Sequence, residues 1–520
     1  MHTLKQLEKR RQHLVDLLAL GVLAGTLRLW GIGFDLPILY HRDEAKYVSI
    51  PLKILKTGDY NPHFFNYPSL FFYILSLAYI AYFLFMASRG RLGSLDGMTL
   101  PEQVLPNVVG RATMSSQFLV GRGVVACAGI LTVLVVYWIV RRAYGRRAGL
   151  IAGLLLSVSP IHIRNCHFVA PDVVMILFVV ASFWFSCQVM LKGKRQDYVL
   201  AGLLAGLAAS TKYNAYSAIV PLFVAHISRQ RRSALLNADL LWAIVACAGG
   251  FFLGTPFALL DLPAFLNGVA FEVHHYTPLG DPGTEGQNAL LWYAGCLLRA
   301  EGPVLLLAIL EAVRGSLRRG QRTLLFACFP ATYMLLVASY AVKNDRTVLT
   351  IVPFLAMLAG AFLDRAIAFI QQKIDVRRRP RIVGWLSAMV PVLLTLFWAA
   401  QRTIQIDTRF TQNDVRTQAT LWLESELLPG SRIVGEYYSP LLENIVHHFR
   451  WVDRAIDQPI AWYEANADYV VFVENRYGGF YLDPSRYPEQ IAGYEEMFLR
   501  FTPLQEFQGG ALGTPCHIMV

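Results

Sequence analysis

The run GRGVVACAGILTVLVVYWIV, residues 121–140, carries a single charged side chain, Arg122. A helix needs about 17–25 predominantly apolar residues to cross a hydrocarbon core of about 30 Å, so this run is long enough to span a membrane. Similar runs recur along the chain of 520 residues, which is 55% hydrophobic and 16% charged. Soluble domains carry roughly a quarter charged residues. The composition therefore excludes a single soluble domain and predicts an all-α protein that crosses a membrane many times.

Working outward from this run, we predict about eleven transmembrane helices. The predicted spans are residues 14–30, 121–140, 150–163, 173–191, 198–210, 215–227, 241–256, 290–310, 324–342, 348–367 and 383–400. The apolar residues 70–87 are assigned to a juxtamembrane or re-entrant helix, because hydrophobicity alone does not prove crossing. With this assignment, an even number of crossings separates each pair of neighbouring basic clusters.

The formal net charge is +11, and the basic residues form short clusters between the apolar spans, such as residues 141–147 and 373–381. Basic loops of this kind face the cytoplasm. Membrane orientation explains the clusters, so no nucleic-acid partner is predicted. We expect a multi-pass protein of a bacterial inner membrane, in contact with membrane lipid, with residues 32–120 and those after about 401 outside the cytoplasm.

Residues 401–520 differ in character from the rest of the chain. A helical pattern ends at Pro429-Gly430, and runs of strand length that contain β-branched residues follow at 432–435 and 467–473. We therefore predict two domains: a transmembrane domain, residues 1–400, and a small extracytoplasmic α/β domain, residues 401–520.

Two adjacent carboxylates, Asp43 and Glu44, open the first external loop directly after His41 and Arg42. Burying such charges beside a membrane is costly, so they usually have a task or a partner. The following residues alternate like an interfacial helix, which would place Asp43 at a helix N-terminus. The alternative is that the pair only caps this helix.

The next stretch of the loop, GDYNPHFFNYPSL at residues 58–70, is dense in Asn, Pro, His and aromatic side chains. Such a loop can stack on sugar faces and hydrogen-bond their hydroxyls, which makes His63 and Tyr67 candidate substrate-binding residues. Pro and Asn also simply make turns, and that reading stays open.

Residues 41–74, HRDEAKYVSIPLKILKTGDYNPHFFNYPSLFFYI, resemble the first external loop of GT-C glycosyltransferases. The similar families are the bacterial protein O-mannosyltransferases and the lipid A aminoarabinose transferases. The resemblance extends over roughly residues 12–365, through the following segments: Tyr144-Gly145-Arg146-Arg147-Ala148-Gly149, Ser159-Pro160-Ile161-His162, Ala170-Pro171-Asp172, Thr211-Lys212-Tyr213-Asn214 and Gly254-Thr255-Pro256-Phe257. It implies a GT-C fold with juxtamembrane helices in the first loop, and it places Asp43 in the active site.

The resemblance also implies roles for Asp172 and for a basic residue in a late loop. The family counterpart of Asp172 contributes to the active site. The alternative is that Asp172 only caps a helix. Arg164 lies in the same loop and could pair with Asp172. A basic late-loop residue contacts the carrier phosphate, and we choose Arg346, followed by Lys343 and Lys212. Positive charge is normally sparse on this side, and Arg and Lys both suit phosphate. The alternative is that these side chains snorkel.

A further candidate substrate or metal site is Glu272-Val273-His274-His275-Tyr276. We take His274, His275 and Tyr276 as candidate substrate-binding residues. Adjacent histidines do not share one face of a helix, so chelation by both requires a special turn. The aminoarabinose transferases hold a metal partly through a first-loop acid, but Asn66 stands at that position here. No cofactor is assigned, and a divalent metal remains an open alternative.

The predicted reaction is an inverting transfer of a sugar from a polyprenyl-phosphate donor to an acceptor glycan, lipid or protein. Asp43 would act as general base or orient the acceptor, with Glu44 and Asp172 as further catalytic groups, His41 binding substrate and the cations stabilising the departing phosphate. Two alternatives remain: a transporter or flippase for lipid-linked sugars, which would carry charges along a midplane path, and a non-catalytic envelope-assembly protein.

Overall fold

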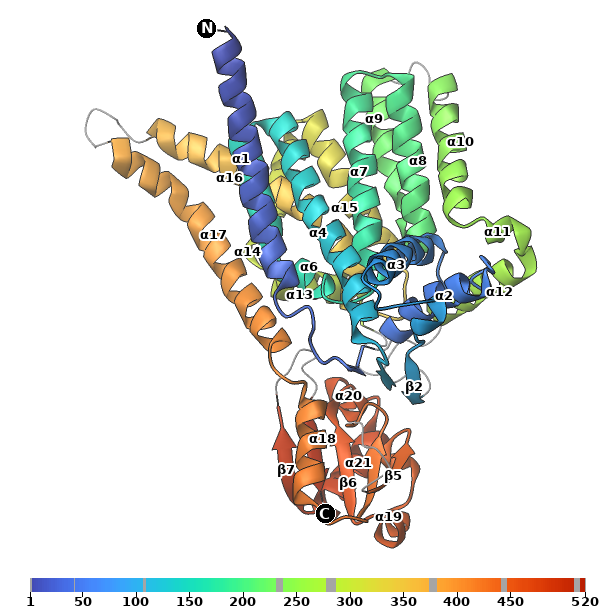
Figure 1. Cartoon of the computed structure of the whole chain (residues 1–520). Helices are drawn as coiled ribbons and strands as arrows, with labels where there is room; N and C mark the ends of the chain where they lie inside the picture. The colour runs from blue at the N-terminus through green and yellow to red at the C-terminus, as the bar shows by residue number, and fades with distance from the viewer. Residues whose placement is uncertain are drawn as a thin grey trace.

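The computed structural model describes residues 2–41, 43–105, 109–230, 237–276, 287–373, 381–440, 447–508 and 515–519. A helical bundle fills most of the molecule, and a small α/β unit stands at one end of it (Figure 1). The N-terminus lies at the far end of the bundle, beyond the link between α7 and α8. One end of the bundle therefore carries the α/β unit, and the other end carries the N-terminus.

The bundle is formed by long apolar helices that mostly match the predicted spans. They are α1 (His2–Leu29), α4 (Ser115–Tyr144), α5 (Arg146–Ser157), α7 (Pro171–Leu191), α8 (Arg195–Thr211), α9 (Val220–Gln230), α10 (Ala238–Gly254), α14 (Pro303–Leu317), α15 (Gln321–Val337), α16 (Val352–Lys373) and α17 (Arg381–Phe410). Within the described residues, six helical segments are long and apolar enough to cross a membrane. The number of crossings stays a prediction.

Two predicted spans are broken in the structure. The span at 290–310 divides into α13 (Ala289–Glu301) and α14, because Gly302 adopts a φ of 46° and Pro303 starts the next helix. The span at 150–163 divides into α5 and α6 (Pro160–Asn165), where the Ser159 hydroxyl caps α6 by accepting from the His162 N–H. Proline fits the first position of a helix but not its interior, which explains both breaks.

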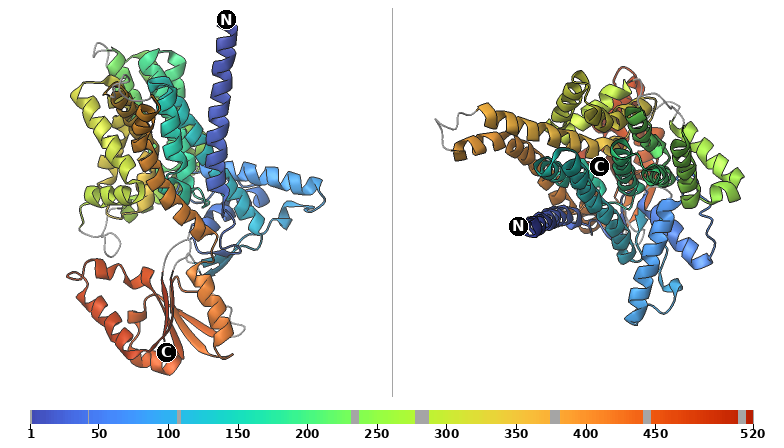
Figure 2. Two further views of the ribbon diagram at one scale, coloured as in Figure 1. Left: turned by 90° about the vertical axis from the view of Figure 1, so that its left-hand side faces the viewer. Right: turned by 90° about the horizontal axis from the view of Figure 1, so that it is seen from above.

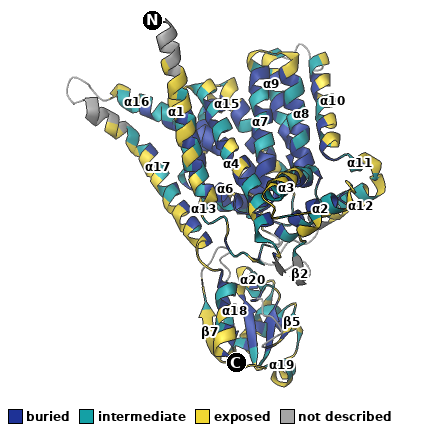
Figure 3. Cartoon of the chain, viewed as in Figure 1, coloured by how far each residue is buried: buried dark blue, intermediate teal, exposed yellow. Residues whose placement is uncertain are grey.

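Many residues on the outside of the bundle are exposed (Figure 3), and a number of them are large and apolar. On α10, Leu241 and Leu253 are exposed, and on α17 Leu394 and Phe397 are exposed. Soluble monomers rarely show such extended apolar surfaces. The exposed faces are those expected of helices that contact lipid.

The first external loop contains two helices and a small sheet. Helix α2 (Glu44–Thr57) is the predicted interfacial helix, and α3 (Leu70–Ser88) runs across the direction of α1 rather than along it (Figure 2). That orientation favours the juxtamembrane assignment of α3, although its length and composition would also allow crossing. An antiparallel sheet that the sequence did not indicate joins the start of the loop to its end. Its strand order is β1 (Ile38–Leu39), β3 (Val109–Arg111), β2 (Glu102–Leu105), and the short η1 (Leu95–Gly97) precedes β2 in sequence.

Shorter elements complete the end of the bundle that faces the α/β unit. They are η2 (Tyr213–Ile219), α11 (Phe257–Leu260), α12 (Leu262–Tyr276) and η3 (Asp345–Ile351). Two of them, η2 and η3, continue into α9 and α16 without a break. The residues of η2 and η3 are therefore held in place by the packed helix that follows each of them.

The C-terminal unit is a five-stranded mixed sheet with the order β5-β4-β6-β8-β7. Strands β4 and β6 confirm the two predicted strands, and β4 pairs in parallel with both neighbours. Helix α17 runs on to Phe410, so the boundary at 400 falls inside a helix and the unit begins at α18. Its elements are α18 (Val415–Glu426), β4 (Arg432–Glu436), β5 (His448–Val452), η4 (Ala455–Asp457), α19 (Ile460–Asn466), β6 (Tyr469–Val473), α20 (Glu474–Tyr477), η5 (Phe480–Leu482), α21 (Pro488–Arg500), β7 (Pro503–Phe507) and β8 (Cys516–Met519).

Candidate active site

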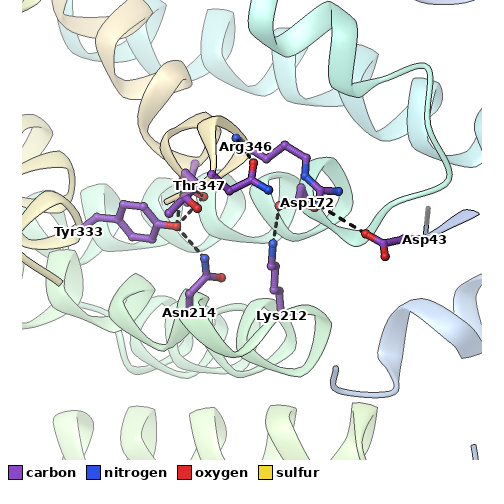
Figure 4. Close-up of polar contacts among 9 residues, drawn as sticks. Asp43, Asp172, Lys212, Asn214, Tyr333, Arg346 and Thr347 are labelled. Atoms are coloured by element: carbon purple, nitrogen blue, oxygen red, sulfur yellow. Dashed lines mark hydrogen bonds and ion pairs between the residues drawn. The ribbon is translucent and has the colours of Figure 1, made fainter. Parts of the chain in front are cut away.

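Four charged side chains from four separate elements meet at the end of the bundle that faces the C-terminal unit (Figure 4). The Lys212 Nζ lies 2.7 Å from an Asp172 carboxylate oxygen. The Arg346 guanidinium lies 3.4 Å from the Asp43 carboxylate. Asp172 and Asp43 both act electrostatically on Arg346, so the two pairs form one cluster of two acids and two bases.

Each of these residues stands where a regular element begins or ends. Asp43 occupies the N-cap position of α2, and Asp172 lies in the first turn of α7. Lys212 ends α8 in an extended conformation, and Arg346 lies in the first turn of η3. Helix ends placed on packed helices hold side chains more firmly than free loops do.

The two ion pairs differ in how open they are. The Asp172 and Lys212 side chains are 5% and 16% exposed, whereas Asp43 and Arg346 are 27% and 24% exposed. The Asp43 side chain makes no capping hydrogen bond to α2, so capping does not account for it. Asp43 is therefore the carboxylate of the cluster that is best placed to meet a substrate.

Lys212 keeps its charge in this environment. Burial alone would lower the pKa of Lys212, but the adjacent Asp172 carboxylate raises it above its usual value. A buried cation held by one carboxylate still offers donors to a second anion.

A hydrogen-bonded group beside the cluster ties its elements together. The Asn214 amide donates to the Tyr333 hydroxyl at 2.7 Å, and that hydroxyl donates to the Thr347 backbone oxygen at 3.0 Å (Figure 4). These bonds fix η2, which follows Lys212, to η3, which carries Arg346. Tyr333 lies in an apolar helix, and nothing in the sequence marked it as part of the site.

Glu44 does not join the cluster, and its predicted catalytic role stays a prediction. Its carboxylate is fully buried, accepts two hydrogen bonds from Arg122 at 2.8 and 2.9 Å, and accepts a third from the Val169 N–H. Burial alone would raise the pKa of Glu44, but the Arg122 guanidinium lowers it. Glu44 thus joins the first loop to α4 and to the segment before α7.

His41 lies next to the cluster as a neutral, partly buried ring. It stacks on Phe168 with ring centroids 4.4 Å apart. Burial, followed by repulsion from Arg346, lowers the pKa of His41 to about 4. Its Nδ1 is buried without a hydrogen-bond partner among the described residues.

The remaining first-loop candidates separate. Tyr67 packs edge-on against Tyr47 at 5.7 Å, and the Lys212 ammonium lies 6.0 Å from the Tyr67 ring. His63 instead bonds Asp59 at 2.7 Å with 65% of its side chain exposed. Tyr67 therefore belongs to the site, and the structure holds His63 in a local turn contact.

Arg164 pairs with Asp345 at 2.5 Å, which corrects the expectation that it would pair with Asp172. Asp172 is already occupied by Lys212. Lys343 is buried and donates to the Ala341 backbone oxygen at 3.3 Å. Arg164 and Lys343 thus contact other partners than the pair of Asp172 and Lys212.

Two cavities flank η3. The first, which we call the tyrosine cavity, has a volume of about 370 Å³ and is lined by Asn66, Tyr67, Lys212, Tyr213, Asn214, Tyr216, Val269, Glu272, Val273, Ser339, Tyr340 and Thr347. The second, the arginine cavity, has a volume of about 580 Å³ and is lined by Pro160, Ile161, Arg164, Trp292, Cys296, Arg299, Ala300, Lys343, Asn344, Asp345, Arg402, Gln405, Ile406 and Arg409. Asp345 lines the arginine cavity and Thr347 the tyrosine cavity, and Arg346 is the residue between them in sequence.

Glu272 gives the tyrosine cavity an acid that titrates near neutrality. Burial raises the pKa of Glu272 to about 7, with Lys212 opposing the shift. Its neighbour His274 is exposed on α12, and the side chains of His275 and Tyr276 lie outside the described part of the chain. Among the described residues, no three His, Cys, Asp or Glu side chains group as metal ligands would.

Comparisons with known proteins concern the family and the fold. The family model of dolichyl-phosphate-mannose-protein mannosyltransferase matches residues 112–257, which include Asp172 and Lys212. No curated protein sequence is similar enough to count as a relative.

Solved structures share the fold over nearly the whole chain. ArnT from Cupriavidus metallidurans in the apo state superposes with a TM-score of 0.51 at 14% identity, covering 96% of this chain and 97% of that one. The apo oligosaccharyltransferase of Archaeoglobus fulgidus superposes with a TM-score of 0.53 at 12% identity, covering 96% and 74%. The same enzyme tethered to an acceptor peptide gives 0.53 at 14% identity, covering 91% and 70%. Residues 112–257 thus match the mannosyltransferase family model, and nearly the whole chain shares the fold of these solved structures.

Proposed function

We propose that this chain is a membrane glycosyltransferase that moves a sugar from a polyprenyl-phosphate donor to a hydroxyl or amine of an acceptor, by a single displacement that inverts the anomeric carbon. The observation that carries the proposal is the cluster of Asp43, Asp172, Lys212 and Arg346. It offers one carboxylate for the acceptor and two cations for the leaving phosphate.

The four side chains of the cluster account for the bond changes and the proton transfer of this reaction. The acceptor oxygen or nitrogen forms a bond to the anomeric carbon while the bond from that carbon to the phosphate oxygen breaks. The bonding pair leaves with the phosphate, where Lys212 and Arg346 stabilise the developing charge. The acceptor proton passes to the Asp43 carboxylate, which acts as general base.

The tyrosine cavity suits the donor. Lys212 lies in its wall, and Tyr67, Tyr213, Tyr216 and Tyr340 supply aromatic surface and hydroxyls for a sugar. The neighbouring α10 and α12 expose apolar side chains such as Leu253 and Leu266, along which a lipid tail can lie. A pocket of a few hundred Å³ with few polar groups is typical of small-ligand sites.

The site lies outside the cytoplasm in this proposal. The basic residues Arg141 and Arg142 end α4, and Lys192 follows α7, at the end of the bundle opposite the cluster (Figure 1). Basic loops mark the cytoplasmic side of an inner membrane. A donor carried by a lipid needs no cytosolic nucleotide sugar at the external face.

A transporter for the same lipid-linked sugars is less well supported. Transport requires charged groups along a path near the bilayer midplane. Here the charged cluster sits at one end of the bundle, where α2, α7, α8 and η3 meet.

The test is the variant Asp43→Asn, purified and assayed with radiolabelled polyprenyl-phosphate sugars. Positioned proton transfer contributes about 10²–10⁴-fold, so kcat is expected to fall by about this factor while the protein stays folded. The matched control is Asp59→Asn, an exposed acid of the same loop, which should keep wild-type activity. Full activity of Asp43→Asn would remove this residue from the mechanism.

A further inference from the structure

The arginine cavity is unusually rich in positive charge. Five of its lining side chains are cationic, namely Arg164, Arg299, Lys343, Arg402 and Arg409, and one, Asp345, is anionic. Asp345 is already paired with Arg164. Four cations therefore face the cavity beyond that pair.

These cations converge from separate elements. Arg299 lies in the last turn of α13, Lys343 precedes η3, and Arg402 and Arg409 lie on the last part of α17. Among the described residues, no carboxylate lies within ion-pair distance of Arg299, Arg402 or Arg409. Snorkelling would spread such side chains along the membrane boundary, whereas here they line one cavity. Mutual repulsion of this kind is relieved by a bound anion.

The arginine cavity adjoins the first turn of η3, which carries Arg346 of the reacting cluster. Asn344 and Asp345 line the arginine cavity, Thr347 lines the tyrosine cavity, and Arg346 between them reaches Asp43. A molecule in the arginine cavity would therefore lie beside the residues that adjoin Arg346, the partner of Asp43.

We propose that the arginine cavity binds a phosphate group of the acceptor, so that the acceptor is an anionic molecule. Guanidinium groups match phosphate oxygens with paired hydrogen bonds, and three of them can share one phosphate group. Calling the ligand the acceptor rests on the proposed function; the anion site itself does not.

The site is tested by photolabelling the full chain in phosphatidylcholine nanodiscs. The probe is a short-chain phosphatidic acid with a diazirine next to its ester, and labelled peptides are located by mass spectrometry. We expect label on α13 and α17, reduced about tenfold or more in Arg402→Gln/Arg409→Gln, because charge-assisted hydrogen bonds to phosphate are lost. About 0.5 M salt should weaken labelling, because the exposed charges are screened.

Arg89→Gln/Arg91→Gln is the matched control, because it removes two exposed arginines outside the cavity, and it should label like the wild type. Competition separates the sources of phosphate: protection by inorganic phosphate indicates a site for the free ion, and protection only by unlabelled phosphatidic acid indicates a lipid-borne group. Absence of label from α13 and α17, or unchanged labelling of Arg402→Gln/Arg409→Gln, would overturn the proposal. Labelling requires no turnover, so an inactive but labelled protein would count against the proposed reaction alone.

Discussion

At the scale of single residues, neighbours in sequence have different tasks. Asp43 and Glu44 are adjacent in sequence. Asp43 forms an ion pair with Arg346 that is partly exposed, whereas Glu44 forms a buried ion pair with Arg122. Successive residues at the start of a helix point in different directions, so one acid reaches the cavity and the next enters the core. A pair of acids in sequence is thus one candidate catalytic group and one structural group.

The buried pair of Glu44 and Arg122 should matter for stability. Removing one partner of a buried ion pair costs about 3–5 kcal/mol, because an uncompensated charge remains. We expect Arg122→Met to lower the melting temperature in detergent strongly. Glu44→Gln/Arg122→Met should recover part of the loss, and the exposed Arg89→Gln should have no effect. Unchanged melting of Arg122→Met would contradict the structural role.

Glu272 predicts a pH dependence. Its pKa in the folded protein is about 7, raised by burial from a usual value of 4.5. The native state therefore holds this proton more tightly than the unfolded state does. The stability that the group contributes is complete below about pH 4.5 and is lost as pH rises through about 7. Melting curves across this range should show the loss in the wild type but less of it in Glu272→Gln; identical profiles would refute the assignment.

At the scale of elements, α8 and α10 pack closely enough to leave no room for side chains at their contact. A Cβ at Gly206 of α8 would overlap the Cys247 carbonyl of α10, and a Cβ at Gly202 would overlap that of Ala243. Small residues allow such backbone approach between membrane helices. Because α8 ends at Lys212, this contact also sets the position of the ammonium.

Gly206→Ala should therefore displace α8 and reduce both stability and transfer activity. Overpacking typically costs about 1–3 kcal/mol, so a drop in melting temperature is expected. Gly249→Ala on α10 is the matched control, since a Cβ there meets nothing within 4 Å. If both variants behave like the wild type, the close packing of the two helices does not matter for the site.

At the scale of the whole molecule, the C-terminal unit is tied to the loop that carries Asp43. The Asp414 N–H donates to the Asp35 carboxylate at 3.0 Å, and Arg416 lies 3.9 Å from the Tyr40 ring. Tyr40 precedes Asp43 by three residues. The unit thus supports the first loop from the side opposite the bundle (Figure 1).

Orientation in the membrane can be tested on the same scale. Ser485 is exposed in the C-terminal unit, and Ser316 is exposed near the end of α14, next to a basic cluster. With the proposed topology, Ser485→Cys should react with a membrane-impermeant maleimide on spheroplasts, and Ser316→Cys only after permeabilisation. The reverse pattern would invert the topology and place the site in the cytoplasm.

The sequence by itself determined that the chain is a bundle of membrane helices with a small α/β unit, because hydropathy, helix caps and strand patterns are local properties. It also marked Asp43, Asp172, Lys212 and Arg346 as charges at unusual places. It could not say which charge meets which: Arg346 and Asp43 are 303 residues apart, and Arg164 is drawn to Asp345, 181 residues away, rather than to Asp172.

Only the tertiary structure decided those partners, the burial of Glu44 and the presence of two cavities that residues of η3 help to line. Electrostatic partners depend on distance in space and on desolvation, and the packing of helices far apart in sequence sets both. The breaks at Ser159 and Gly302 show the same limit, since an apolar run does not reveal where proline and glycine will turn the chain.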